Sequence, residues 1–251
     1  MTDPRSLTVA VLGGTGDQGQ GLAFRFARAG VRVVIGSRDG ARAAASAAEL
    51  AERVERAGPA SGSASGSASG SAGGSASNSA SDSARGSVTG RANAEAAAEA
   101  DVVIIAVPWS AHQPTIAELV ESLRGKIVVD CVNPLAFDER GPSRIDVPEG
   151  SAAEQAAQLL PESRVVGAFH NVSAVTLSDP AVDDLDQDVL VLGDDREATD
   201  VVRALADLLP GVRGIFAGRL RNSAQVEALT ANLIAINRRY KTHAGIKISG
   251  V

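Results

Sequence analysis

The feature that most constrains this chain is a glycine cluster set between a short apolar run and an apolar-periodic run. The apolar run is residues 7–12, Leu-Thr-Val-Ala-Val-Leu, and the cluster is residues 13–21, Gly-Gly-Thr-Gly-Asp-Gln-Gly-Gln-Gly. Apolar side chains then recur every three to four residues, at Leu22, Ala23, Phe26 and Ala27. The first run predicts a strand and the periodic run predicts an amphipathic helix, so the glycines make a tight turn between them. The stretch is typical of the first half of a βαβ unit.

The glycines of this turn have separate physical tasks. Gly14 makes the sharp bend, Gly16 lets the backbone approach a pyrophosphate, and Gly19 lets the helix pack closely on its strand. Phosphate oxygens would then accept hydrogen bonds from free N–H groups at the helix N-terminus. Because a strand precedes the cluster and a helix follows it, the pattern predicts a dinucleotide site rather than an ordinary glycine-rich turn.

The end of the second predicted strand indicates which dinucleotide binds. A site for NAD usually places Asp or Glu about 20 residues after the glycines, where it accepts a hydrogen bond from the ribose 2′-hydroxyl. Here the strand at 31–35 ends in Gly36-Ser37-Arg38, with no acid at its tip. A guanidinium offers a planar fork of donors to phosphate oxygens, and Arg42 follows four residues later, within reach of the same anion if a helix starts here. The sequence therefore predicts NADP.

Composition and charge limit the class of protein. The 251 residues carry a formal net charge of −6, with dispersed basic residues, which argues against a nucleic-acid surface. No stretch approaches the roughly 18 apolar residues of a membrane span, and residues 1–6 do not open a secretory signal, so we expect a cytoplasmic protein. Cys131 is the only cysteine and lies in an apolar run, so we expect a buried core residue rather than a reactive thiol.

Strand and helix patterns alternate along the rest of the chain. Helical patterns cover 41–56, 93–100 with Asn93 as N-cap, 109–123, 151–160 with a capping box, 196–209 and 223–239, whereas 134–150 is irregular. With the strand patterns between them, they predict an α/β, doubly wound and mainly parallel sheet with a small C-terminal helical lobe. We expect an NADP-binding domain over 1–58 and 84–220, a flexible Gly/Ser/Ala loop inserted at 59–83, and a helix and tail at 221–251 that pack on the cofactor crevice.

Ligands of such a sheet bind outside the carboxyl ends of its strands. The segments expected there are the glycine cluster, Ser37-Arg38, 107–109, Asn133-Pro134 and 169–174. The sequence contains no Cys/His metal cluster, no G-x-S-x-G elbow and no Walker lysine. A dinucleotide site without acid–base apparatus favours hydride exchange between two bound cofactors, in which positioning carries most of the rate.

Taken together and in order, the motifs resemble those of the F420-dependent NADP oxidoreductase family. The resemblance rests on residues 13–21, 36–38, 107–109, 165–172, 192–195, 220–223, 226–230 and 245–247, and it covers nearly the whole chain outside 59–83. It implies a Rossmann domain with NADP in the glycine crevice and the 5-deazaflavin ring of F420 stacked on the nicotinamide.

The resemblance also implies which residues form the site. Thr15, Gly16, Asp17 and Gln18 would hold the pyrophosphate, and Ser37, Arg38 and Arg42 the 2′-phosphate; Val107, Trp109 and Ala174 would border the nicotinamide, and Asn133, His170, Val172 and Thr230 the deazaflavin. Asn133 and Ser173 are more polar than the family's usual residues there, and position 42 is Arg where Lys also occurs. No catalytic side chain and no metal are implied, because the hydride passes directly between the cofactors, and His170 has only a positioning role.

Other functions also fit the residues. An NADPH-dependent reductase of a small organic substrate, similar to relatives of 6-phosphogluconate dehydrogenase, normally adds a proton donor from a large helical C-terminal domain, whereas this chain ends in one long helix. A non-catalytic NADP(H) sensor would need no acid–base residues either. The cytosolic module of metal-reducing membrane proteins would require a haem-bearing membrane domain, which this sequence lacks. We expect small-molecule cofactors as partners, neither nucleic acid nor membrane, and leave a homodimer open.

Overall fold

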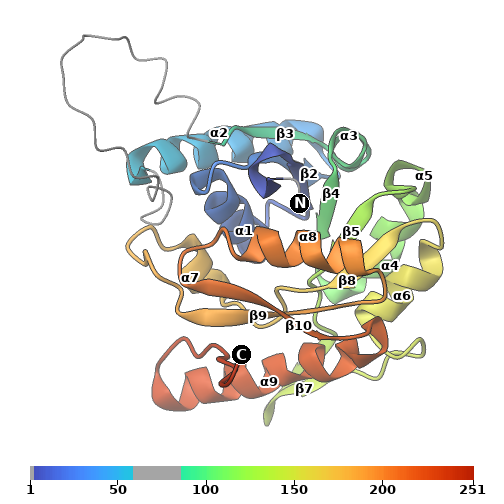
Figure 1. The fold of residues 1–251 in the computed structure, drawn as a ribbon, viewed down its shortest axis with the longest axis vertical. Helices are drawn as coiled ribbons and strands as arrows, with labels where there is room; N and C mark the ends of the chain where they lie inside the picture. The colour runs from blue at the N-terminus through green and yellow to red at the C-terminus, as the bar shows by residue number, and fades with distance from the viewer. Residues whose placement is uncertain (1–2, 59–85) are drawn as a thin grey trace.

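A computed structural model describes residues 3–58 and 86–251 of the chain. Its centre is an eight-stranded sheet of order β10-β9-β8-β5-β4-β1-β2-β3, with helices on both faces (Figure 1). Neighbouring strands pair in parallel, except that β8 and β9 are antiparallel. The α/β, mainly parallel architecture predicted from the sequence is thereby confirmed, whereas the loop predicted at 59–83 lies outside the described residues.

The elements alternate as the sequence pattern predicts. The strands are β1 (Thr8–Leu12), β2 (Arg32–Ser37), β3 (Val88–Ala92), β4 (Val102–Ile105), β5 (Ile127–Asp130), β6 (Leu135–Asp138), β7 (Gly141–Arg144), β8 (Arg164–Gly167), β9 (Gln187–Gly193) and β10 (Val212–Gly218). The helices are α1 (Asp17–Arg28), α2 (Gly40–Ala57), α3 (Asn93–Glu99), α4 (Trp109–Glu118), α5 (Val120–Leu123), α6 (Ala152–Leu159), α7 (Ala174–Ser178), α8 (Arg196–Ala206) and α9 (Ser223–Tyr240), with short 3-10 turns η1 (Pro4–Ser6) and η2 (Leu220–Asn222).

The apolar strands are buried on both faces, as parallel strands between two helix layers must be. In β1, Val9 and Val11 pack into the core that α1, α2 and α8 cover, whereas Ala10 and Leu12 pack into the core beneath α3 to α6. From β1 the strand order runs to β2 and β3 on one side and to β4, β5 and β8 on the other. The switch point therefore lies between β1 and β4, and a crevice is expected outside their carboxyl ends.

Three local predictions need correction. The segment 134–150 is not irregular, because β6 and β7 pair as an antiparallel hairpin; most of its residues are exposed, so they leave no apolar alternation to read. Asn93 is the first residue of α3 rather than its N-cap, which is Ala92. The helix predicted over 109–123 is divided at Leu119 into α4 and α5. By contrast, the predicted start of the helix at Ser151 is confirmed: Ser151 is the N-cap of α6, and its Oγ accepts a hydrogen bond from the Glu154 N–H at 3.0 Å. The Glu154 carboxylate accepts from the Ser151 hydroxyl at 2.9 Å.

The C-terminal helix α9 lies along one end of the molecule, red in Figure 1. Its Glu227 carboxylate accepts hydrogen bonds from the Ala152 and Ala153 N–H groups, at 3.0 and 3.1 Å, at the N-terminus of α6. The tail after α9 returns to the sheet, where Asp188 bonds to both Arg213 and the Ile248 N–H. None of the helices in the described ranges is long and apolar enough to cross a membrane.

Candidate functional site

A cavity of about 950 Å³ opens at the expected switch point, outside the carboxyl ends of β1, β2 and β4. It is lined by the glycine turn, by the start of α2 and by the segment that enters α4. The cavity brings together the residues predicted for the pyrophosphate and the 2′-phosphate, and also Val107: Thr15, Gly16, Asp17, Gln18, Ser37, Arg38, Arg42 and Val107. These residues come from three separate parts of the chain, so their convergence is a property of the fold.

Close packing against the neighbouring backbone requires glycine at three positions of the turn. A Cβ on Gly13 would lie 2.7 Å from the Ala106 carbonyl oxygen, one on Gly14 2.7 Å from the Val11 oxygen, and one on Gly19 2.7 Å from the Gly13 oxygen. Gly13, with φ +76°, rather than Gly14, takes the left-handed conformation that the bend requires. A Cβ on Gly16 would meet only the Gly13 oxygen, at 3.4 Å. Three glycines therefore let the turn pack closely on its neighbours, while the open space at Gly16 leaves the backbone accessible from the cavity.

The helix that follows suits an anion. Gly16 is the N-cap of α1 and makes no side-chain capping bond, so the first-turn N–H groups are not capped by a side chain. A helix N-terminus favours negative charge through its free donors and its dipole, which fits a pyrophosphate. Asp17 can contribute only its backbone N–H, because its carboxylate would repel the phosphates.

The far corner of the cavity carries two arginines at the start of α2. Asp39 Oδ1 accepts hydrogen bonds from the Ala41 and Arg42 N–H groups, at 2.9 and 3.2 Å, and this cap starts α2 at Gly40. Arg38 and Arg42 consequently flank the cap, and both are exposed and line the cavity. Asp39 Oδ1 is engaged with the helix, and the two guanidinium groups suit the corner to a phosphate monoester.

A second cavity, of about 230 Å³, adjoins the first and shares Gln18, Ala106, Val107 and Pro108 with it. Trp109, at the start of α4, lines one side of this smaller cavity. Cys131, Val132 and Asn133, which follow β5, line the other side. Trp109 and Asn133, predicted to border different cofactor rings, therefore share one cavity.

Three of the residues predicted for the deazaflavin are joined by hydrogen bonds. Asn133 Nδ2 donates to the His170 carbonyl oxygen at 3.0 Å, and Thr230 Oγ1 donates to the same oxygen at 2.9 Å. Asn133 Oδ1 lies 3.2 Å from His170 Nδ1, so this nitrogen carries the hydrogen and Nε2 keeps its lone pair. Burial lowers the pKa of His170 to about 4, so the ring is neutral at pH 7. Within the described part of the chain, Nε2 is buried without a partner.

The turn that carries His170 is bonded to the glycine turn. Phe169, buried with φ +63°, packs edge-on against Phe26 with ring centroids 5.9 Å apart, and its carbonyl oxygen accepts a hydrogen bond from Gln18 Nε2 at 3.3 Å. Ala174 starts α7, a helix that sequence reasoning missed, and α7 packs on α1. His170, Val172, Ala174 and Thr230 line neither of the two cavities described above, so their ligand contacts stay predictions.

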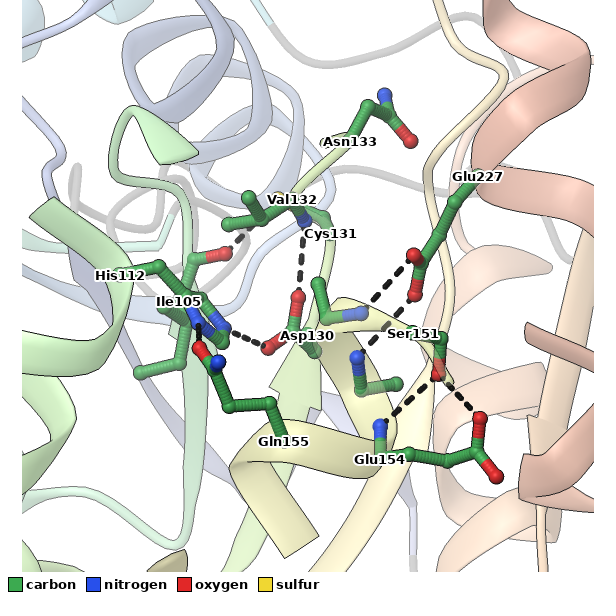
Figure 2. Close-up of polar contacts among 12 residues, drawn as sticks. Ile105, His112, Asp130, Cys131, Val132, Asn133, Ser151, Glu154, Gln155 and Glu227 are labelled. Carbon is green, nitrogen blue, oxygen red and sulfur yellow. Dashed lines mark hydrogen bonds and ion pairs between the residues drawn. The ribbon is translucent and has the colours of Figure 1, made fainter. Parts of the chain in front are cut away.

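A buried polar cluster beside the smaller cavity was also missed (Figure 2). His112 Nε2 lies 2.6 Å from Asp130 Oδ2, and its Nδ1 lies 2.9 Å from Gln155 Oε1. Burial lowers the pKa of His112, but the bonds to Asp130 and Gln155 outweigh it and raise the pKa overall. Burial raises the pKa of the nearby Glu227 to about 7. The only sequence signal was an Asp that ends an otherwise apolar strand.

Cys131 is a core residue, as predicted. Its thiol donates to the Ile105 carbonyl oxygen at 3.1 Å, and burial raises its pKa, which disfavours a reactive thiolate. Among the residues that the structure describes, no three His, Cys, Asp or Glu side chains are grouped so that they could hold a metal ion.

Comparison with known proteins places this site in a family. Residues 8–134 match the family model described as NADP oxidoreductase, coenzyme F420-dependent. The F420-dependent NADP reductase of Methanothermobacter thermautotrophicus is 38% identical over 250 residues, which cover 98% of this chain and 96% of that protein. That of Methanocaldococcus jannaschii is 37% identical over 248 residues, covering 98% and 99%. A crystal structure of a candidate F420-dependent NADP reductase from Arthrobacter sp. FB24 superposes with a TM-score of 0.70 at 27% identity, covering 97% and 99%. The chain belongs to the family of F420-dependent NADP oxidoreductases.

Proposed function

We propose that this protein transfers a hydride between coenzyme F420 and NADP. One observation carries the proposal: a single cavity joins the glycine turn at the start of α1 to Ser37, Arg38 and Arg42. That combination suits a dinucleotide with a 2′-phosphate, and membership of the family supplies the second cofactor.

The adenosine half of NADP would be fixed by charge and by backbone donors. The N–H groups of Thr15, Asp17 and Gln18 would bind the pyrophosphate beside Gly16, whose own N–H donates to the Gly13 carbonyl oxygen at 2.9 Å. Arg38 and Arg42 would bind the 2′-phosphate together with the Ser37 hydroxyl. NAD lacks that phosphate, so Arg38 and Arg42 would have no anion to bind in this corner. The Asp39 carboxylate also lines the cavity, but its Oδ1 is engaged in capping α2. The geometry therefore favours NADP over NAD.

The nicotinamide end would be bordered by Val107, Trp109 and Ala174. When both cofactors are bound, reduced F420 supplies a hydride from carbon to C4 of the nicotinamide. On the deazaflavin side we place Asn133, His170, Val172 and Thr230. The hydrogen bonds of Asn133 and Thr230 to His170 support this placement. These groups would orient the rings and exclude water. In a direct hydride transfer, this orientation supplies most of the rate acceleration.

The remaining parts of the proposal concern organisation. We assign NADP binding to residues 1–58 and 84–220, and we propose that the C-terminal element 221–251 closes the site. The hydrogen bond of Thr230 to His170 and those of the Glu227 carboxylate to the N-terminus of α6 support the second assignment. We further propose that the enzyme works in the cytoplasm and forms a homodimer.

A spectrophotometric assay tests the function. The oxidation of reduced F420 is followed by absorbance with NADP or NAD supplied in turn, and we expect turnover with NADP and far less with NAD. NADPH binding without any turnover of F420 would support a sensor instead. Reduction of a small organic substrate by NADPH, with no use of F420, would support the other reductase.

A further inference from the structure

The pair of His112 and Asp130 has no part in the proposed function so far. His112 lies on α4 and Asp130 ends β5, and neither side chain has any exposed surface. Removing two charges from water is unfavourable unless good geometry and further hydrogen bonds compensate. The surroundings of the pair provide such bonds.

The protonation state of His112 follows from its neighbours. Gln155 Nε2 donates to a Glu149 carboxylate oxygen at 3.2 Å, so the amide oxygen must face His112 Nδ1. On the other side, Nε2 faces a carboxylate oxygen of Asp130. Because both facing groups are acceptors, both ring nitrogens donate and His112 is an imidazolium.

The pair connects the two sides of the smaller cavity. Asp130 Oδ1 accepts a hydrogen bond from the Val132 N–H at 3.0 Å, which fixes the turn that leads into Asn133. Trp109 lies three residues before His112 on α4, and the two rings are 5.3 Å apart at 32°. Figure 2 shows His112 reaching from α4 to Asp130 at the base of the 130–133 segment. One bonded unit therefore holds the Trp109 side and the Asn133 side together.

We propose that His112 and Asp130 are positioning residues, which fix the spacing between Trp109 and Asn133 and so the placement of the two cofactor rings. The inference rests on the proposed function, since it assigns the pair a purpose within that reaction. Neither residue touches a reacting atom. A displacement of about 1 Å between reacting groups can lower a rate by about 100-fold, so a small change in this spacing has a large effect.

Two variants separate geometry from charge. In H112Q one amide cannot span both Asp130 and Gln155, so the unit is broken. In D130N the new amide still accepts from the Val132 N–H and donates to Nε2 of a neutral His112, so every bond of the unit survives. We expect kcat to fall about 10- to 100-fold in H112Q but to stay within about threefold in D130N. The Kd of NADP should change less than about threefold in either, because the phosphate contacts are separate.

Trp109 provides a measurement that does not depend on turnover, because it is the only tryptophan of the chain. Quenching of its emission by acrylamide, in the protein without ligands, reports how accessible the ring is. We expect accessibility to rise in H112Q and to match the wild type in D130N. The matched control is L205A, a fully buried residue of α8 in the other core, which should lower stability without changing kcat or Trp109 accessibility.

The outcomes separate the two proposals. A kcat for H112Q within about twofold of wild type overturns the positioning inference, and so does a D130N variant as slow as H112Q. If the wild type does not oxidise reduced F420 with NADP, the proposed function fails. The accessibility of Trp109 still tests the inference in that case, because unchanged accessibility in H112Q would overturn it. Should H112Q not fold, D130A removes the acceptor of both His112 Nε2 and the Val132 N–H. A kcat and a Trp109 accessibility equal to wild type in that variant would contradict the inference.

Discussion

Removal of the Arg38 guanidinium tests the assignment of the 2′-phosphate corner. Arg38 is exposed and lines the larger cavity but not the smaller one, so its loss should weaken NADP without disturbing the second cofactor. A hydrogen bond to a charged group contributes about 1.5–3 kcal/mol, equivalent to about 10- to 150-fold in affinity. Because Arg38 is exposed and Arg42 remains, we expect R38A to lie in the lower part of that range, near 10- to 30-fold.

The assay is steady-state turnover, with each cofactor varied at saturating levels of the other. We expect the KM for NADP to rise about 10- to 30-fold, the KM for F420 to change little, and the preference for NADP over NAD to shrink. Added salt should raise the wild-type KM for NADP and should affect R38A less, because screening acts on the interaction that R38A removes.

The matched control is R32A, which removes an exposed arginine from the same strand at its opposite end. It changes net charge equally and lies away from the cavity lining, so both KM values should stay at wild type. Equal effects of R38A on the two KM values, or an R32A effect as large as that of R38A, would refute the role given to Arg38.

Three further predictions concern the glycine turn, a buried acid and a buried base. G19A places a methyl group 2.7 Å from the Gly13 carbonyl oxygen, so the glycine turn must shift. Calorimetry should then show NADP binding at least about 10-fold weaker, and unchanged binding would contradict the role given to the glycine turn. Burial raises the pKa of Glu227 from 4.5 to about 7, so between those pH values the folded state binds a proton that the unfolded state has lost, and the free energy of unfolding of the wild type falls as pH rises. E227Q lacks this proton, so its free energy of unfolding relative to wild type should increase by about 3 kcal/mol from pH 4.5 to pH 8. A difference that does not change with pH would be inconsistent with this burial. Arg25 is buried and donates to the carbonyl oxygens of Leu177, Val182, Thr176 and Asp179. Because each buried acceptor left without a partner costs about 1–3 kcal/mol, R25M should lower the free energy of unfolding by about 3–5 kcal/mol in denaturant titration, and a loss below about 1 kcal/mol would show that these bonds matter little.

The parts of the fold that could be predicted are those encoded locally. The glycine turn, the tip of β2 and the start of α2 each lie within one short stretch, so spacing alone predicted the cavity that holds Gly16 and Arg38. The apolar strands were equally clear, because a strand buried on both faces leaves a continuous apolar run.

The parts that were missed depend on tertiary contacts. The β6–β7 hairpin has mostly exposed residues and no alternation, and the short α7 packs only because α1 receives it. His112, Asp130 and Gln155 come from α4, β5 and α6, so no spacing in the sequence joins them. An isolated histidine in a helix of mixed polar and apolar residues gives no sign of the carboxylate that it contacts in the fold.

The central claim is that one site holds both cofactors so that hydride passes directly between them. Reduced F420 with deuterium at both hydrogen positions of its hydride-bearing carbon is reacted with NADP in ordinary water, and the NADPH formed is analysed by mass spectrometry. Direct transfer predicts that deuterium is recovered on C4 of the nicotinamide. Deuterium lost to water, or NADPH formed without the label, would contradict it.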